Sequence, residues 1–133
     1  MEYDKKDFIE IEVKKLIDWK GGNGEGCFVS NKITKEGWKV GYMYREEPEE
    51  GVPDSGWRFM QGEESDEYNS DASNVNIFAI NTICNYDPDI IPYLNLPIGT
   101  VLIRISEHEF EIDKGDKQIY TTMQEREQPR KNK

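Results

Sequence analysis

Hydrophobic residues recur along this chain at two different spacings, and the spacing changes after the first twenty residues. The first apolar positions fall at the spacing of one helix face. They are Ile9, Val13, Leu16 and Ile17. Asp7 is suited to cap such a helix, and the glycine-rich run at 21–24 is suited to end it. We therefore predict an N-terminal helix over residues 7–20.

Two later segments alternate with a period of two, which is typical of β-strands. Residues 38–45 direct one set of side chains to the same side, and residues 57–61 alternate in the same way after a turn at Asp54. We expect the two strands to pair antiparallel, so that their aromatic side chains anchor one core. The predicted anchors are Trp38, Tyr42, Trp57 and Phe59.

The remaining pattern supplies shorter elements. Residues 27–30 read as a strand, and residues 77–86 place apolar side chains on one helix face. Asp87 followed by Pro88 is typical of a helix start. Residues 101–105 and 110–112 read as a β-hairpin. Together these elements predict an α+β fold with a mostly antiparallel sheet, an N-terminal helix and short helices in the middle of the chain.

The length of 133 residues corresponds to one domain with a single core. We expect residues 1–22 to hold the N-terminal helix and its linker, and residues 23–122 to form the α+β domain. Residues 123–133 are charged and lack apolar anchors, so we predict a disordered tail.

Charge narrows the choice of partners. The net charge is −10, from 27 acidic and 17 basic residues. Nucleic-acid binding depends on Lys and Arg contacts to phosphate, so such a balance disfavours nucleic acid. It disfavours anionic membrane surfaces as well. A basic protein partner is favoured through steered association, and solubility alone is the simpler alternative.

No apolar run has the length of a membrane-spanning helix, and the charged N-terminus lacks the pattern of a signal peptide. Cys27 and Cys84 are isolated in the sequence, which is typical of reduced core residues rather than of a disulfide framework. We therefore expect a cytoplasmic protein.

Acidic residues gather in two places, the proline-containing loop 46–53 and the run that follows Gly62. Arg58 is expected to form an ion pair with Asp54 or Glu63. Its first role is then structural, and its second role is to contact a binding partner. The candidate partner-binding residues are Glu46, Glu47, Arg58, Glu63, Glu64, Asp66 and Glu67. The carboxylates are also hard ligands of the kind that divalent cations prefer, although a calcium-loop motif is absent. A solvated acidic face is the third interpretation.

No catalytic constellation emerges from the sequence. His108, the single histidine, lies between glutamates without a neighbouring nucleophile motif, so we interpret it as a surface residue. The cysteine and histidine spacing matches no zinc pattern. We assign no catalytic residue, no metal ligand and no cofactor.

Several strings resemble a known bacterial family. They are residues 26–30, 33–48, 54–59, 62–63, 66–68, 81–83, 85–92 and 97–99, beginning with Gly-Cys-Phe-Val-Ser and including Gly-Trp-Lys-Val-Gly-Tyr-Met-Tyr-Arg and Asp-Ser-Gly-Trp-Arg-Phe. The chain resembles the domain-of-unknown-function family numbered 2185, grouped with immunity-protein-33-like domains. The resemblance covers roughly residues 26–105.

The resemblance implies an immunity protein that neutralises a toxin of a bacterial polymorphic or contact-dependent system by binding it in the cytoplasm. It brings no catalytic residues. The leading hypothesis is therefore a non-enzymatic acidic binding domain whose partner is a basic toxin domain. Two alternatives remain open: a divalent-metal-dependent enzyme that uses the acidic cluster 63–67, and an interaction module with another protein partner. The oligomeric state is not indicated.

Overall fold

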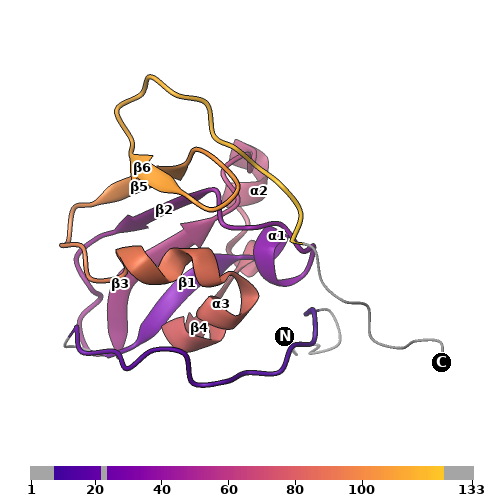
Figure 1. The fold of residues 1–133 in the computed structure, drawn as a ribbon. Coiled ribbons are helices and arrows are strands. Elements are labelled where there is room, and N and C mark those ends of the chain that lie inside the picture. Colours follow the sequence, from indigo (N-terminus) through magenta and orange to yellow (C-terminus); the bar gives the residue numbers. More distant parts are fainter. Residues whose placement is uncertain (1–7, 22–23, 125–133) are drawn as a thin grey trace.

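The computed structural model describes residues 8–21 and 24–124 and contains six strands and several short helices (Figure 1). In chain order the elements are β1 (Gly26–Ser30), α1 (Asn31–Thr34), β2 (Tyr42–Arg45), β3 (Asp54–Met60), α2 (Asp66–Asn69), η2 (Ala72–Asn74), β4 (Val75–Ala79), α3 (Ile80–Tyr86), η3 (Pro88–Tyr93), β5 (Val101–Arg104) and β6 (Phe110–Ile112). The fold is therefore α+β. Within the described ranges, no helix is long and apolar enough to cross a membrane.

All six strands belong to one mixed sheet, in the order β4-β1-β3-β2-β5-β6. The predicted antiparallel pairing of β2 with β3 and the predicted β5–β6 hairpin are confirmed. The sequence did not indicate that β1 and β3, at the centre, run parallel. This pair arises because the chain leaves β1, passes through α1 and β2, and returns along β3 in the original direction, as a parallel pair requires a crossover.

One face of the sheet is covered by α3 and η3, which lie in front of it in Figure 1. The core lies between these helices and the sheet. Its buried apolar strand residues include Val29, Met43, Trp57, Phe59 and Leu102. The helices contribute Ile80, Ile83, Cys84 and Ile90. Both cysteines are free and buried, as predicted.

The predicted N-terminal helix is wrong. Residues 8–21 are not helical but form an extended segment that lies against α3. Asn81 accepts from the backbone N–H of Leu16 at 2.7 Å and donates to the carbonyl of Lys14 at 2.9 Å. Asn85 binds the N–H and carbonyl of Lys14 in the same manner. These side-chain amides supply the partners that helical hydrogen bonds would otherwise provide, so the extended form is satisfied. The predicted cap, Asp7, lies outside the described residues.

The expectation that residues 38–45 present one continuous face is also wrong. Val40 and Met43 are both buried in the core, although they are three positions apart. Trp38 and Tyr42 are only partly buried, so neither is a core anchor. The alternation shifts at Gly41, which lies so close to β3 that an added Cβ would be 2.2 Å from the carbonyl oxygen of Gln61. Only a glycine permits this approach.

The predicted helix over residues 77–86 begins three residues late. Residues up to Ala79 form β4, and Ile77 is 70% exposed instead of facing the core. The predicted start at Asp87 is confirmed, since its carboxylate accepts from the N–H of Asp89 and Pro88 opens η3. At the C-terminus, Met123 forms a β-bridge with Trp38. Most of the predicted tail lies outside the described residues.

Candidate functional site

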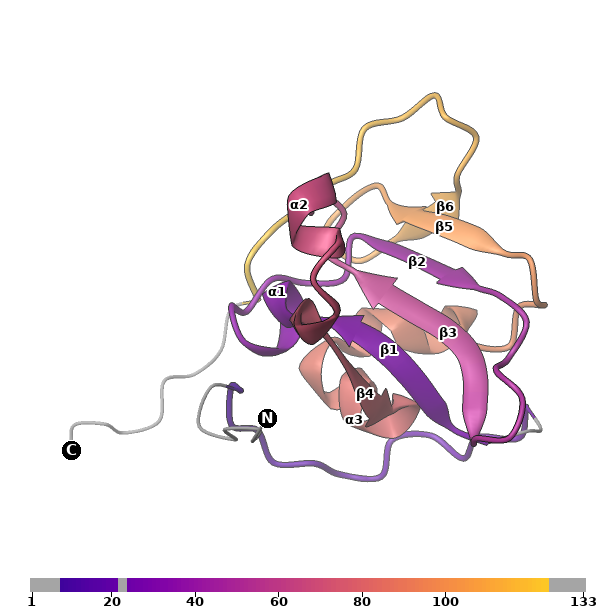
Figure 2. The same cartoon turned by 180° about the vertical axis from the view of Figure 1, so that it is seen from behind.

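The sheet face opposite α3 and η3 is not covered by these two helices (Figure 2). We call it the open face. Strand register determines its members, because neighbours of the core residues point the other way. The residues of the open face are Phe28, Tyr42, Tyr44, Arg58, Met60, Ile77, Val101 and Ile103.

Arg58 lies at the middle of the open face and is 4% exposed. Its guanidinium donates to both carboxylate oxygens of Asp54, at 2.8 and 2.9 Å, and to Glu46 at 2.6 Å. It also stacks over Phe28, 4.2 Å from the ring centroid. The predicted pairing with Asp54 is therefore present, whereas Glu46 rather than Glu63 is the second partner. Bidentate pairing of this kind holds the arginine in one orientation.

Asp54 connects this arginine to the loop between β2 and β3. Its carboxylate accepts from the N–H of Glu49 at 2.7 Å and of Gly56 at 3.0 Å. Gly56 has a φ of +92°, and a Cβ there would meet the carbonyl oxygen of Glu46 at 2.2 Å. The turn therefore requires glycine. Arg58 and Asp54 thus fix the loop that carries Glu46 and Glu47 at one end of the open face.

Hydrogen bonds from Arg58 lower the pKa of Asp54 from 3.8 to about 2, despite burial. The same bonds raise the pKa of Arg58, against the opposing effect of burial. Because the folded-state pKa of Asp54 is depressed, its contribution to stability is present above the unfolded pKa and is lost as the pH falls through the folded value.

We expect Asp54→Asn to remove about 2 kcal/mol of unfolding free energy near pH 6, the equivalent of the pKa difference. The gap between wild type and variant narrows as the pH falls from about 5 to about 2, because the carboxylate of the unfolded chain becomes protonated over that interval, before that of the folded protein does. Urea unfolding at a series of pH values measures the gap. A gap that stays constant would show that the charge of Asp54 is not responsible.

Two tyrosines form the aromatic part of the open face. The rings of Tyr42 and Tyr44 are 5.7 Å apart and tilted, and both side chains are partly exposed. Burial raises the pKa of both phenols, with Glu46 adding to the effect at Tyr44. Both phenols therefore stay neutral at physiological pH. Partly exposed tyrosines beside apolar side chains are typical of protein-binding surfaces.

Carboxylates border the open face at both ends of β3. Glu46 and Glu47 are exposed in the loop before β3, while Glu63, Asp66 and Glu67 are exposed after it. We call these five residues the acidic border.

Glu64, the remaining predicted contact of this acidic run, is only partly exposed. Its carboxylate accepts from the N–H of Gln61 at 2.8 Å and of Gly62 at 2.9 Å, so it caps the end of β3. Among the described residues, no group of three histidine, cysteine or acidic side chains is placed to hold a metal ion.

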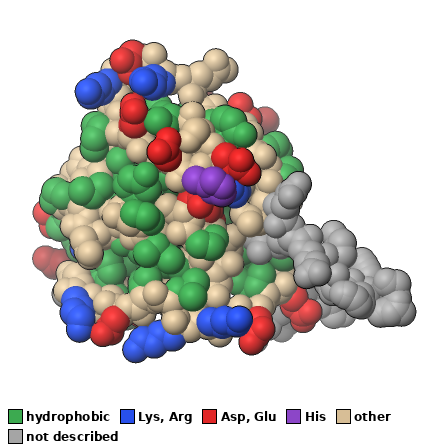
Figure 3. Space-filling view, viewed as in Figure 1, with side chains coloured by type: hydrophobic (Ala, Val, Ile, Leu, Met, Phe, Trp, Pro, Cys, Tyr) green, Lys and Arg blue, Asp and Glu red, His purple; other side chains and the backbone are tan. Residues whose placement is uncertain are grey.

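A buried ionic network on the other side of the sheet was missed by sequence reasoning. Arg104 is completely buried and donates to Asp87 at 2.7 Å and to Asp89 at 2.8 Å. Asp89 also binds Lys39 at 3.1 Å and lies 3.0 Å from the ring of His108, the single histidine seen among acidic side chains in Figure 3. Hydrogen bonds from Arg104, His108 and Lys39 lower the pKa of Asp89, against the opposing effect of burial. The network joins η3 to the sheet, and His108 is exposed at its edge.

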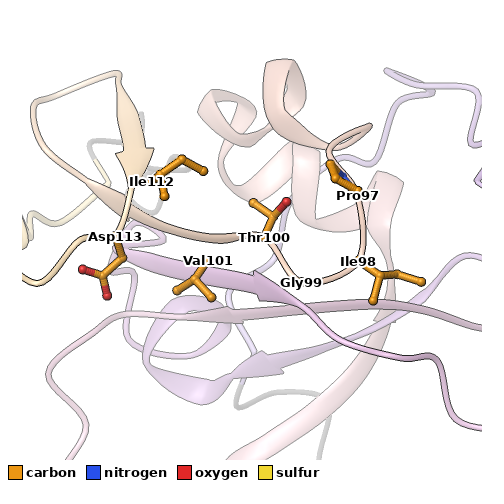
Figure 4. Close-up of a pocket in the computed structure, with 7 residues that line it drawn as sticks. All are labelled: Pro97, Ile98, Gly99, Thr100, Val101, Ile112 and Asp113. Carbon is orange, nitrogen blue, oxygen red and sulfur yellow. The ribbon is translucent and has the colours of Figure 1, made fainter.

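The surface formed by the described residues includes the following two hollows. A shallow one of about 420 Å³ lies between the loop 97–100 and β6 (Figure 4). Ile98, Ile112 and Asp113 line part of it. A more enclosed hollow of about 270 Å³ lies at the start of β1, beside the open face. Phe28, Val52 and Ile77 contribute apolar walls, and Glu49 and Asp54 contribute carboxylates.

The fold and the open face together define a small α+β domain with a surface suited to protein binding. The family model described as the Immunity protein Imm33 domain matches residues 27–114, which is more than half of the chain. The chain therefore belongs to the Imm33 immunity protein domain family, as the resemblance indicated. The matched range includes all six strands except Gly26, the first residue of β1. No curated protein and no solved structure matches the chain.

Proposed function

We propose that this protein is an immunity protein that neutralises a toxin by binding it directly, in the cytoplasm of the cell that makes both. Family membership is the observation that carries the proposal. The open face supports it, because it presents the partly exposed side chains of Tyr42, Tyr44 and Met60. Aromatic residues and methionine are enriched at protein interfaces. Inhibition by binding requires no catalytic residue in the inhibitor.

The partner is proposed to be a basic toxin domain. The chain carries a net charge of −10, and the acidic border lies around a partly apolar centre. An apolar centre with a charged rim is the usual anatomy of a specific interface. Complementary charge raises the association rate and discriminates between partners.

The experiment is co-expression of this protein with each toxin encoded beside its gene, followed by growth measurement and co-purification. We expect the wild type to restore growth and to co-purify with one of the toxins. Tyr44→Ala is expected to weaken that complex at least tenfold, since aromatic residues at the centre of an interface contribute most of its binding energy. Calorimetry on the purified pair measures the change.

Two charge reversals test the acidic border. Glu67→Lys lies in the border, and Glu10→Lys makes the same change in the N-terminal segment, where Glu10 is also exposed. We expect Glu67→Lys to slow association and reduce its salt dependence, and Glu10→Lys to do neither. Failure of the wild type to rescue growth with any toxin would contradict the immunity proposal. Rescue with equal binding by both charge variants would contradict the acidic border alone.

A further inference from the structure

The two edges of the sheet differ in how they are protected. β6 is one edge; it has three residues, and Glu111 on it pairs with Lys117 at 3.4 Å. Short length and charge are the usual devices that prevent an edge strand from pairing with another chain. β4 is the other edge, and its five residues, Val-Asn-Ile-Phe-Ala, include no charge, proline or glycine. The β4 edge therefore lacks the protection that β6 has.

The backbone of β4 offers free hydrogen-bonding groups on its outer side. In an antiparallel pair, alternate residues bond to the partner strand and the others direct their N–H and C=O groups away. Ile80 donates to the carbonyl of Glu25 at the end of the β1–β4 pair. The same alternation turns Asn76 and Phe78 toward β1 and leaves Ile77 and Ala79 facing outward. The carbonyl of Ala79 is taken up by the first turn of α3, because Ala79 is the N-cap of that helix. The N–H groups of Ile77 and Ala79 and the carbonyl of Ile77 have no backbone partner among the loop and cap hydrogen bonds of the described residues.

The side chains beside this edge are also exposed. Ile77 is 70% exposed, and it lies on the open face opposite Phe28. Together with Val52, which is 48% exposed, it forms part of the hollow at the start of β1. An apolar side chain of a neighbouring strand would cover surface here that is now in contact with water.

We propose that the β4 edge accepts an extended strand of the toxin, which adds to the sheet as a seventh strand. The added strand would bond through the N–H and carbonyl of Ile77 and the N–H of Ala79, and its apolar side chains would cover Ile77. Pairing by strand addition takes affinity from main-chain hydrogen bonds and specificity from alternate side chains. This inference rests on the proposed function and names the binding mode.

The occupant is proposed to carry basic residues at both ends of its strand. Exposed carboxylates lie near each end of β4: Asp71 comes shortly before it in the chain, and Glu49 lines the hollow beside Gly26, the β1 partner of Ala79. A second copy of this chain would bring the same carboxylates against their equivalents. With a net charge of −10 on each copy, self-pairing is opposed by repulsion.

A fluorescent heptapeptide, Lys-Thr-Val-Thr-Val-Thr-Lys, serves as the probe, with a variant in which the central threonine is proline as its control. We expect the probe to bind the full chain, to shift the amide NMR signals of β4, and to slow hydrogen exchange at Ile77 and Ala79. The proline peptide should do none of these. Absence of binding at millimolar peptide, or shifts confined to another surface, would overturn the inference.

Two variants separate backbone pairing from side-chain contact. Ile77→Pro removes an outward N–H without removing a bond to β1, whereas Ile77→Ala keeps the N–H and shortens the side chain. We expect Ile77→Pro to weaken probe binding at least tenfold more than Ile77→Ala, with both variants folded by circular dichroism. Equal weakening would contradict strand addition. So would slow exchange at Ile77 before any probe is added, since the chain's own ends or a second copy would then occupy the edge.

The same variants distinguish this inference from the function on which it rests. If wild type rescues cells from the toxin and Ile77→Pro rescues equally well, the protein is an immunity protein that does not use β4. If wild type rescues no cell from any neighbouring toxin, the proposed function itself fails. If Ile77→Pro no longer rescues the cells and Ile77→Ala still does, the result supports both the immunity function and binding at the β4 edge.

Discussion

Trp57→Ala is expected to lower the free energy of unfolding by about 3–5 kcal/mol, the range observed when large buried aromatic side chains are truncated. Trp57 has no exposed surface, and its ring stacks on Phe59 with centroids 5.9 Å apart. Its indole N–H donates to the carbonyl of Leu94 at 3.1 Å. Truncation therefore leaves a cavity, and it also removes the indole donor that binds the carbonyl of Leu94. Chemical denaturation measures the loss.

Trp38→Ala is the matched control, because it deletes the same side chain from a partly buried position. We expect a loss of roughly 1 kcal/mol, which is ordinary for a point substitution outside the core. Similar losses for the two variants would mean that the core is centred elsewhere than between β3 and the helices.

The contrast between Trp57 and Trp38 shows where the alternation of side chains along a strand predicts burial correctly and where it does not. The pattern of residues 57–61 gave the correct inward face, because the irregularity of β3 at Gly56 lies before these residues. The burial predicted from the alternation of residues 38–45 is wrong at Gly41, because residues distant in sequence change the backbone's hydrogen-bond partners there. The N–H of Val40 is bound by Asp87, and its carbonyl by Arg104. Side chains distant in sequence thus replace strand partners there, and no local pattern records that.

The prediction of a helix over residues 7–20 was wrong for a related reason. Its apolar residues fit a helix face, yet Ile9, Ile11, Ile17 and Trp19 also fit two stretches with a period of two. The choice between the two spacings is made by Asn81 and Asn85, more than sixty residues away, whose amides bind the extended backbone. The predicted helix over residues 77–86 contains both asparagines, but the sequence pattern does not indicate what their side chains bind.

The candidate site was partly predictable. Arg58 was expected to pair with Asp54 or Glu63, and the pairing with Asp54 is confirmed. The acidic residues after Gly62 were identified correctly as exposed, except that Glu64 binds backbone amides instead. A signal for the ionic network was present in Arg104, a charge inside an apolar strand. Such a residue requires a buried carboxylate partner, although the sequence does not say which one.

Asp87→Ala is expected to destabilise the protein on the order of 3–5 kcal/mol, as is usual when one partner of a buried ion pair is removed. Asp87 and Arg104 both have completely buried side chains. The substitution also removes the acceptor for the N–H of Val40, at 2.9 Å. Asp87→Asn keeps an oxygen in place and removes only the charge. It should therefore cost less than Asp87→Ala, and thermal and urea unfolding of the two variants separates the charge from the hydrogen bonds.

Arg104→Met in combination with Asp87→Ala shows whether the charges depend on each other. Each single variant leaves one buried charge without its main partner, whereas the double variant leaves neither. We expect the double variant to lose at least about 1 kcal/mol less than the sum of the single losses, within the range of coupling between contacting residues. Recovery should be incomplete, because Arg104 also donates to the carbonyl of Val40 at 2.7 Å and that bond is lost as well. Strictly additive losses would show that Asp89, which also binds Arg104, already neutralises the arginine without Asp87.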